Sequence, residues 1–487
     1  MSKALAVAFA FSLAHGGNMP AQRIQPLNNV PAEGIQMAFL ATDGSVIGQG
    51  NSGNHWYRYV PDINGDYSDG TWSQIASLQN GYAPSAMASD VLADGRLAII
   101  GGEYNGTNSP YPLQLTNLGA IYDPAKNQWT ALTHPGGWDY IGDSPSSVLP
   151  NGDMLVGNKL TTEAAYLDPS TLKWKKVKTT GKADFNAEEG WTLLPDGSIL
   201  TEDVKDAPNS ERYVPSMHEW FSAGSTIVDL HSPSPYKTCL RYGPKIKDCY
   251  LPPGEIGPAI LRPDGSVFVT GSGSGLNGGG AGHTAIYQTQ GSQAGTWSVG
   301  PDFPNDDNAG DSWAALLPSG NVLVFGVTGA LYEWNGSTLT QTGTYGGVPL
   351  LLPTGQVMII GSSIGLYTGS GSPQSSWAPT ITNSPSSVNP GSTYQISGTQ
   401  FNGLGQAMSF GDEYQNATNY PLVRITNNNT GHVFYAKTHN HSTMAVATGN
   451  ATVYTYFDVP TSIETGPSTI EVVANGIASE PSPITVY

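Results

Sequence analysis

The stretch that decides the fold is TLLPDGSILTED, residues 192–203. Two apolar segments flank a Pro-Asp-Gly turn, which is the pattern of a β-hairpin closed by a tight turn. Six other stretches have the same form: FLATDGSVIGQG (39–50), DVLADGRLAIIGG (90–102), SVLPNGDMLVGN (147–158), AILRPDGSVFVTG (259–271), ALLPSGNVLVFG (315–326) and LLLPTGQVMIIG (350–361). The sequence therefore predicts seven hairpins of one kind and a repeating, all-β fold.

Most of these hairpins are followed by a strand with tyrosine, a turn and a strand with tryptophan. Three clear cases are AIYDPAKNQW (120–129), AAYLDPSTLKW (164–174) and ERYVPSMHEW (211–220). Four strands per unit, at a spacing of about 50 residues, predict a seven-bladed β-propeller, because each small sheet buries its faces only against its neighbours. We interpret the recurring aromatic residues as packing between blades, since residues at a fixed place in every repeat serve the repeat.

The pattern changes after residue 378. PTITNSPSSVNPGSTYQISGTQF (379–401) begins a segment of alternating strands without further tryptophan closures. About 110 residues of this kind predict an immunoglobulin-like β-sandwich. The expected domains are the propeller over 18–378 and the sandwich over 379–487, after an N-terminal extension over 1–17.

The N-terminal extension resembles a short signal peptide. An apolar run, ALAVAFAF (4–11), follows Lys3 and precedes the small-residue segment SLA (12–14). It is too short to span a membrane, so we expect a secreted or periplasmic protein. Cys239 and Cys249, the two cysteines of the chain, lie in one loop, where a local disulfide suits an exported protein.

The charge of the chain restricts its partners. The net charge is −18, so nucleic acids and anionic membranes would be repelled. Small neutral molecules or cations remain as ligands, and we expect a monomer.

Nearly the whole chain resembles galactose oxidase and its relatives, which combine a kelch-type propeller with such a C-terminal domain. FGDEYQNATNYPLVRI (410–425) is similar to that family's C-terminal hairpin. KTHNHSTMAVATG (437–449) looks like a bacterial subgroup of kelch proteins. The resemblance implies the fold, and in the oxidases of the family it implies a copper site with a cysteine cross-linked to tyrosine.

Counting residues back from each hairpin turn identifies the positions that would carry the copper ligands. The residue eight places before each turn is expected at the channel mouth opposite the turn. The seven residues at this register are Ile35, Ala86, Asp143, Glu188, Ile256, Asp311 and Gly346. By the resemblance, Ile35 stands at the cysteine position, Ala86 at the cross-linked tyrosine position, and Tyr345-Gly346 at a Tyr-His pair. The hairpin position falls near Tyr414 and Gln415 without a histidine. Because copper(II) prefers imidazole nitrogens, no copper-radical site is expected.

Asp143, Glu188 and Asp311 instead predict an acidic ring at the channel mouth, with Glu189 one step inward and Glu255 one step outward. Such carboxylates can cap backbone N–H groups or lie solvated in a wet channel. They can also raise each other's pKa and act as general acid and base. As a third alternative, Asp143, Glu188 and Asp311 would bind Ca²⁺ or Mg²⁺, which prefer oxygen ligands.

Histidines add a second set of candidates. His283 and His55 are expected on the face of the acidic ring, as proton carriers or as hydrogen-bond partners of a neighbouring loop. His439 and His441, two residues apart, are either a metal pair or structural residues of the C-terminal domain.

Two functions remain open from the sequence. The first is a binding protein for a carbohydrate or related small molecule that retains the oxidase scaffold without its copper. The second is an oxidase or carbohydrate-processing enzyme that uses Asp143, Glu188 and Asp311, assisted by Tyr345 and His283. Fold alone does not choose between them, because propellers host many activities. The sequence identifies neither the substrate nor a cofactor, and it does not decide whether the chain is an enzyme.

Overall fold

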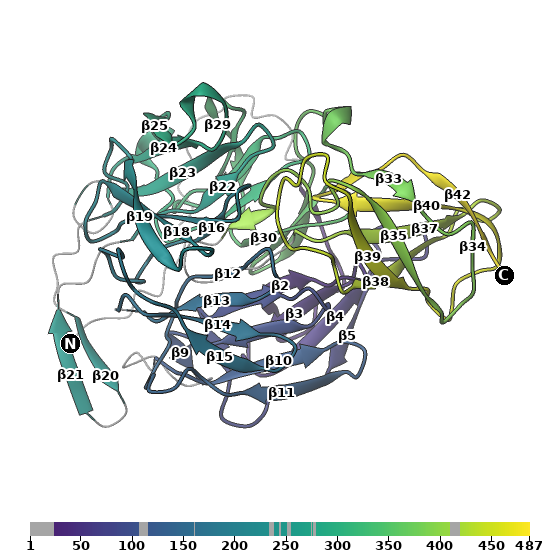
Figure 1. Cartoon of the computed structure of the whole chain (residues 1–487), viewed down its shortest axis with the longest axis horizontal. Helices are drawn as coiled ribbons and strands as arrows, with labels where there is room; N and C mark the ends of the chain where they lie inside the picture. Colours follow the sequence, from purple (N-terminus) through teal and green to yellow (C-terminus); the bar gives the residue numbers. More distant parts are fainter. Residues whose placement is uncertain are drawn as a thin grey trace.

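The computed structural model describes residues 24–106, 115–159, 161–232, 238–242, 245–250, 255–273, 275, 279–409 and 419–487. The fold is all-β, and seven antiparallel sheets form the blades of a propeller (Figure 1). This confirms the predicted fold class for the N-terminal domain.

Each blade begins with its innermost strand, except that blade 7 receives its outer strand from the N-terminal side of the chain. Blade 1 consists of β2 (Ile35–Leu40), β3 (Val46–Gly50), β4 (Trp56–Val60) and β5 (Thr71–Ile75), and blade 2 of β7 (Ala88–Val91), β8 (Leu97–Ile100), β10 (Gly119–Asp123) and β11 (Gln128–Leu132). Blade 3 consists of β12 (Ser146–Val148), β13 (Met154–Gly157), β14 (Ala164–Asp168) and β15 (Lys173–Lys176), and blade 4 of β16 (Thr192–Leu193), β17 (Ile199–Glu202), β18 (Asn209–Val214) and β19 (Glu219–Ser225). Blade 5 consists of β22 (Ala259–Leu261), β23 (Ser266–Gly273), β24 (Gly282–Gln288) and β25 (Thr296–Val299), and blade 6 of β26 (Ala314–Leu316), β27 (Val322–Phe325), β28 (Ala330–Trp334) and β29 (Leu339–Thr344). Blade 7 consists of β30 (Val348–Leu351), β31 (Val357–Ile360) and β32 (Ile364–Tyr367) together with β1 (Ile24–Pro26).

The remaining propeller elements are small. A short ribbon pairs β6 (Pro84–Ser85) with β9 (Tyr104–Asn105). The described residues also form the 3₁₀ turns η2 (Gly291–Gln293), η3 (Pro304–Asp306) and η4 (Ser375–Trp377). A separate hairpin of β20 (Thr238–Tyr242) and β21 (Lys245–Tyr250) projects from the propeller (Figure 1). Its register places Cys239 opposite Cys249, and the disulfide between them stays a prediction. Among the described residues no helix has the length and apolar character needed to cross a membrane.

Aromatic residues join neighbouring blades, as the repeat predicts. Tyrosine and tryptophan rings pair within a blade, for example Tyr122 with Trp129 at a centroid distance of 5.1 Å. Indole N–H groups then donate to backbone carbonyls of the preceding blade: Trp129 to Ala76 (2.9 Å), Trp174 to Thr133 (2.5 Å) and Trp297 to Ala223 (3.0 Å). The tryptophans therefore pack blade against blade, which confirms their interpretation as structural residues.

The C-terminal domain is one continuous curled sheet around its own apolar core. Its strands are β33 (Thr380–Asn383), β34 (Ser387–Val388), β35 (Thr393–Thr399), β37 (Leu422–Asn427), β38 (Val433–His439), β39 (Val453–Asp458), β40 (Gly466–Ala474), β41 (Ile477–Ala478) and β42 (Ser482–Val486). The sheet is continuous because β38 pairs with β37 in its first half and with β39 in its second. The immunoglobulin-like assignment of this domain stays a prediction.

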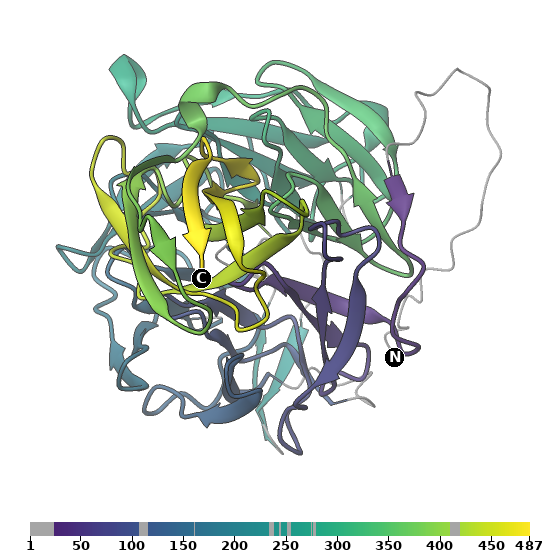
Figure 2. The same cartoon turned by 90° about the vertical axis from the view of Figure 1, so that its right-hand side faces the viewer.

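The C-terminal domain covers the propeller face that carries the hairpin turns (Figure 2). Backbone N–H groups of this domain donate to carbonyls at the turns of blades 1, 2 and 3: Thr438 to Thr42 (3.0 Å), His441 to Ala93 (3.4 Å) and Met444 to Pro150 (3.0 Å). From this side β36 (Met408–Ser409) pairs with the inner strand β26 of blade 6. The opposite ends of the inner strands, where the sequence predicts the acidic ring, face away from the C-terminal domain.

Candidate functional site

The candidate site lies where the chain enters the inner strands. Glu188 and Asp311 stand a few residues before β16 and β26 and adopt left-handed backbone conformations, with φ of 59° and 53°. Ala86, at the same register in blade 2, has φ of 47°. Positive φ is uncommon for residues other than glycine, and strained backbone of this kind concentrates at functional sites. This conformation recurs in blades 2, 4 and 6, whereas Ile35, Asp143, Ile256 and Gly346 at the same register do not adopt it.

A lysine joins two of the predicted carboxylates. The Lys159 ammonium contacts the Asp143 carboxylate and lies 2.9 Å from Oε1 of Glu188. The Lys159 and Asp143 side chains are 6% and 2% exposed, and the Glu188 side chain is 16% exposed. The ion pairs therefore form in a largely dry environment, where each charge depends on its partners. The structure thus brings together Asp143 and Glu188 from adjacent blades 3 and 4.

Two further glutamates interact electrostatically with this ion pair. Burial raises the pKa of Glu103, with Glu188 and Asp311 adding to the rise and Lys159 opposing it. Burial likewise raises the pKa of Glu255 well above its usual value, and Glu188 and Asp311 add to that rise. We call Glu103, Asp143, Lys159, Glu188, Glu255 and Asp311 the mouth cluster. It contains five carboxyl groups and one ammonium group, drawn from blades 2 to 6.

The sequence reasoning missed Lys159 and Glu103. Both follow the second strand of a blade, seven and eight residues after the turn glycines Gly152 and Gly95. The second strand returns to the face from which the first strand departs, so counting residues forward from the turn would also have predicted residues at the mouth. Counting only backward from the turn predicted the carboxylates and not the lysine between them.

Glu188 and Glu189 belong to different environments. Glu188 reaches Lys159 at the mouth, whereas Glu189 is fully buried within blade 4, with Oε1 2.7 Å from the ammonium of Lys182. The two side chains diverge at the point where the backbone passes through the positive φ of Glu188. The sequence predicted Glu189 as an inner member of the acidic ring. In the structure Glu189 instead belongs to a separate buried environment.

Tyr345 and His283 make their own local contacts. The Tyr345 hydroxyl hydrogen-bonds with Oγ of Ser363 at 2.7 Å. Nδ1 of His283 lies 2.8 Å from a carboxylate oxygen of Asp302, and His55 contacts Glu33 in the same manner at 3.0 Å. None of these contacts involves a carboxylate of the mouth cluster. The assisting roles predicted for Tyr345 and His283 stay predictions.

The positions that correspond by resemblance to the copper ligands of the oxidases are described only in part. Ile35 and Ala86 are buried and carry no nitrogen or sulfur donor. Position 346 is glycine, and Tyr414 and Gln415 lie outside the described residues. Because copper(II) prefers imidazole nitrogens, the absence of a copper-radical site stays a prediction.

The geometry also gives little support to a metal ion shared by Asp143, Glu188 and Asp311. Lys159 stands between Asp143 and Glu188, where a shared ion would lie. Within the described ranges, the one group of ligand atoms that all lie within 4.8 Å of one another comes from Asp184, Glu189 and Asp203. A metal role for the mouth carboxylates stays a prediction.

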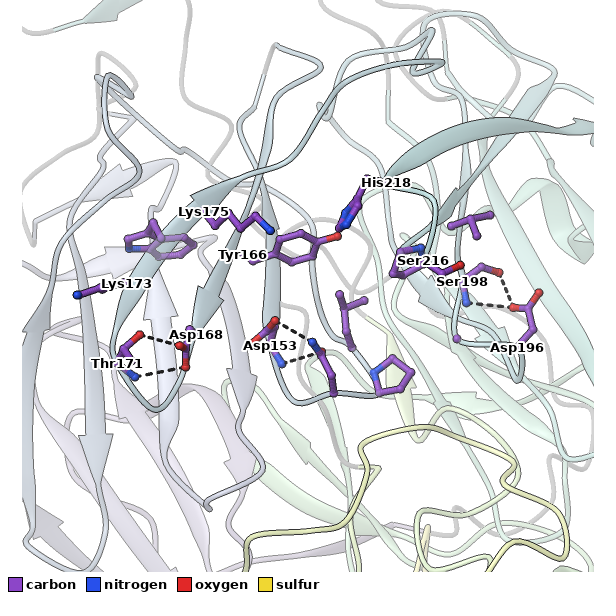
Figure 3. Close-up of a pocket in the computed structure, with 17 residues that line it drawn as sticks. Asp153, Tyr166, Asp168, Thr171, Lys173, Lys175, Asp196, Ser198, Ser216 and His218 are labelled. Atoms are coloured by element: carbon purple, nitrogen blue, oxygen red, sulfur yellow. Dashed lines mark hydrogen bonds between the residues drawn. The ribbon is translucent and has the colours of Figure 1, made fainter.

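A pocket of about 810 Å³ lies between blades 3 and 4, at the face that carries the hairpin turns (Figure 3). Its carboxylates are held by their own turns: Asp168 accepts hydrogen bonds from Ser170 and Thr171, and Asp196 from Ser198. Such turn contacts are structural. The mouth cluster differs, because Lys159 of blade 3 pairs with Glu188 of blade 4.

Comparisons with known proteins leave the family open. No family model matches the chain. An N-acetylneuraminate epimerase of Yersinia enterocolitica is 28% identical over 113 residues, which make up 23% of this chain and 27% of the epimerase. The chain thus spans about a quarter of the length of that curated relative.

Two solved structures match the chain at low identity and with TM-scores below 0.5. A fungal alcohol oxidase of the AA5 family, solved with copper, has a TM-score of 0.48 and 13% identity, covering 95% of this chain and 98% of its own. Virginiamycin B lyase of Staphylococcus aureus has a TM-score of 0.47 and 11% identity, covering 71% and 98%. Because the identities and TM-scores are this low, neither the oxidase activity nor the lyase activity is assigned to this chain.

Proposed function

We propose that the protein binds a carbohydrate or related polyol at the mouth cluster. The observation that carries this proposal is the buried ion pair of Asp143, Lys159 and Glu188, which interacts electrostatically with Glu103 and Glu255. The raised pKa of Glu103 and Glu255 favours the protonated carboxyl, which donates as well as accepts hydrogen bonds. Sugar hydroxyl groups require both kinds of partner.

The location agrees with such a ligand. The mouth cluster stands at the ends of the inner strands opposite the hairpin turns, and Asp311 is exposed. The partial relative is named for N-acetylneuraminate, which is also a sugar. Export of the protein, expected from its N-terminal segment, remains part of this proposal.

The test compares ligand binding by matched variants. We expect saturation-transfer NMR with a panel of neutral, amino and acidic sugars to identify a ligand, and calorimetry to show binding at least about tenfold weaker for Glu188→Gln, a loss of about 1.4 kcal/mol. The control is Glu163→Gln, which removes a carboxylate that is exposed in the same blade as Lys159, 3.2 Å from Lys176. Equal affinity in the two variants would exclude the mouth cluster as the site.

A second candidate function is acid–base processing of the same ligand. Glu255 has a raised pKa beside Glu188, and such a carboxyl can act as a general acid near neutral pH. Incubating the sugars of the panel with parent and Glu255→Gln, and following them by NMR, separates the two functions. Conversion by the parent alone identifies an enzyme, whereas binding without conversion leaves a binding protein.

A further inference from the structure

Blade 4 contains a second cluster of ionisable residues, separate from the mouth. We call Lys182, Asp184, Glu189, Asp203 and Glu211 the blade 4 cluster. All five are buried, and Asp184, Glu189 and Asp203 are at most 3% exposed. Each of these three offers one carboxylate oxygen, and the three oxygens all lie within 4.8 Å of one another. Three carboxylates this close and this dry require compensating positive charge.

Lys182 compensates only part of this charge. Its ammonium lies 2.7 Å from Oε1 of Glu189 and 2.6 Å from Oε2 of Glu211. One positive charge therefore faces four carboxylates, and two of them already share it. The charge balance leaves Asp184 and Asp203 without a direct cationic partner among the described residues.

Asp184 and Asp203 differ in their hydrogen bonding. Asp184 accepts backbone N–H groups of Phe185 (2.7 Å) and Lys205 (2.6 Å), which ties the segment before β16 to the segment after β17. Oδ1 of Asp203 is buried and receives no hydrogen bond from any described residue. A buried carboxylate oxygen without a donor is costly, so a ligand or a proton is expected there.

We infer that Asp184, Glu189 and Asp203 form a site for a hard divalent cation, with Ca²⁺ the best match. All three ligands are carboxylate oxygens, the donors that Ca²⁺ and Mg²⁺ prefer. Ca²⁺ tolerates irregular arrangements at distances of about 2.3–2.6 Å, whereas Mg²⁺ demands near-ideal octahedral geometry and usually keeps several waters. Ligands from two irregular segments in a dry interior therefore suit Ca²⁺ better.

The cation would also order the mouth. Glu189 is the direct neighbour of Glu188, and Asp184 begins the segment that leads to both. A cation that fixes Asp184 and Glu189 to Asp203 limits the motion of this segment. Glu188 is thereby held toward Lys159, although the cation site itself does not depend on the function proposed for the mouth.

Terbium luminescence provides a direct test, because Tb³⁺ replaces Ca²⁺ at oxygen sites and is sensitised by nearby tryptophan. The Lys182 ammonium lies 4.9 Å from the ring centroid of Trp220, so this indole is close to the cluster. We expect excitation of tryptophan to give terbium emission from the chelator-treated protein, and Ca²⁺ to displace it at lower concentration than Mg²⁺. Asp203→Asn should bind terbium at least about tenfold more weakly, since ligand charge sets the affinity of such sites.

The matched control is Asp196→Asn, which removes an exposed carboxylate of the same blade that hydrogen-bonds Ser198. It should retain the calcium-displaceable emission. Trp220→Phe should dim the emission while leaving the calcium-induced rise in Tm intact. Emission that survives Asp203→Asn, or that Ca²⁺ does not displace, would overturn the site by locating terbium elsewhere on this acidic chain.

Thermal melting distinguishes loss of the site from loss of the fold. Asp203→Asn removes a buried charge, so without calcium it should melt at or above the Tm of the calcium-free parent. Saturating Ca²⁺ should raise the Tm of the parent by several degrees and leave the variant unchanged. A parent without any calcium-dependent shift would overturn the cation site.

Discussion

Adjacent residues in this protein can serve unrelated purposes. Glu188 joins an ion pair between blades at the channel mouth, and Glu189 joins a buried cluster within blade 4. A buried carboxylate is tolerated where a cation meets it, and each of these glutamates has its own lysine. The pair of glutamates before a buried strand therefore marks two sites rather than one.

We predict that Lys159→Met destabilises the protein by about 3–5 kcal/mol, because Asp143 and Glu188 then lose their shared cation in a dry environment. Urea unfolding of the parent and variant measures this change. Lys176→Met is the matched control, since Lys176 is 44% exposed and pairs with Glu163 at 3.2 Å. The control should change stability by less than about 1 kcal/mol. Similar losses in both variants would mean that the buried ion pair contributes no more than a surface one.

At the scale of elements, the ring depends on a strand from the far end of the chain. β1 pairs with β32 as the outer strand of blade 7, with Ile24 opposite Tyr367. The N–H of Leu27 donates to the carbonyl of Ile364 at 2.8 Å. Since β30, β31 and β32 come from residues after 347, this pairing joins the two ends of the propeller and closes the ring.

We predict that a chain starting at residue 28 is less stable than one starting at residue 24 by at least about 2 kcal/mol. The shorter chain loses the β1 hydrogen bonds and the buried side chain of Leu27. Thermal and urea unfolding of the two truncated proteins measure the difference, and the chain starting at 24 serves as the control. Equal stability would show that blade 7 needs only its three other strands.

At the scale of the whole molecule, the C-terminal domain and the propeller meet around His441, a half-buried histidine whose Nε2 atom is buried. Nδ1 of His441 lies 2.8 Å from the Thr455 hydroxyl, and its backbone N–H donates to Ala93 of blade 2. His439 instead lies 3.1 Å from Asp458, so the two histidines face different partners. This geometry favours the structural interpretation of the pair over a shared metal.

Burial and the neighbouring His439 lower the pKa of His441 to about 3. The unfolded chain binds this proton near pH 6.5, so between these values the unfolded state holds more protons and stability falls as the pH falls. We predict that His441→Gln makes the fall in unfolding free energy from pH 6.5 to pH 4 shallower, by up to about 1.4 kcal/mol per pH unit.

Urea unfolding at several pH values measures this slope. Buried Asp90, whose pKa is raised by burial, acts in the opposite direction, so the difference between variant and parent is the informative quantity. The control is His432→Gln, which removes a histidine that contacts Glu464 at the periphery of the domain. An unchanged slope in His441→Gln would show that this histidine does not resist protonation in the folded protein.

The sequence by itself determined the propeller and the register of its mouth. Seven repeats of two apolar strands around a tight turn are a local pattern, and local patterns are visible in one dimension. For the same reason counting back from the turn found Asp143, Glu188 and Asp311. The tryptophans could likewise be assigned to blade packing, because they recur at one place in the repeat.

The tertiary structure decided which groups meet. That Lys159 joins Asp143 to Glu188, and that Lys182 meets Glu189 and Glu211, depends on how blades 3 and 4 pack and how each loop returns. The direction of the Glu189 side chain depends on a positive φ at Glu188 that no residue preference predicts. Charge pairing between distant segments is a property of three-dimensional distance, and the order of residues along the chain does not contain it.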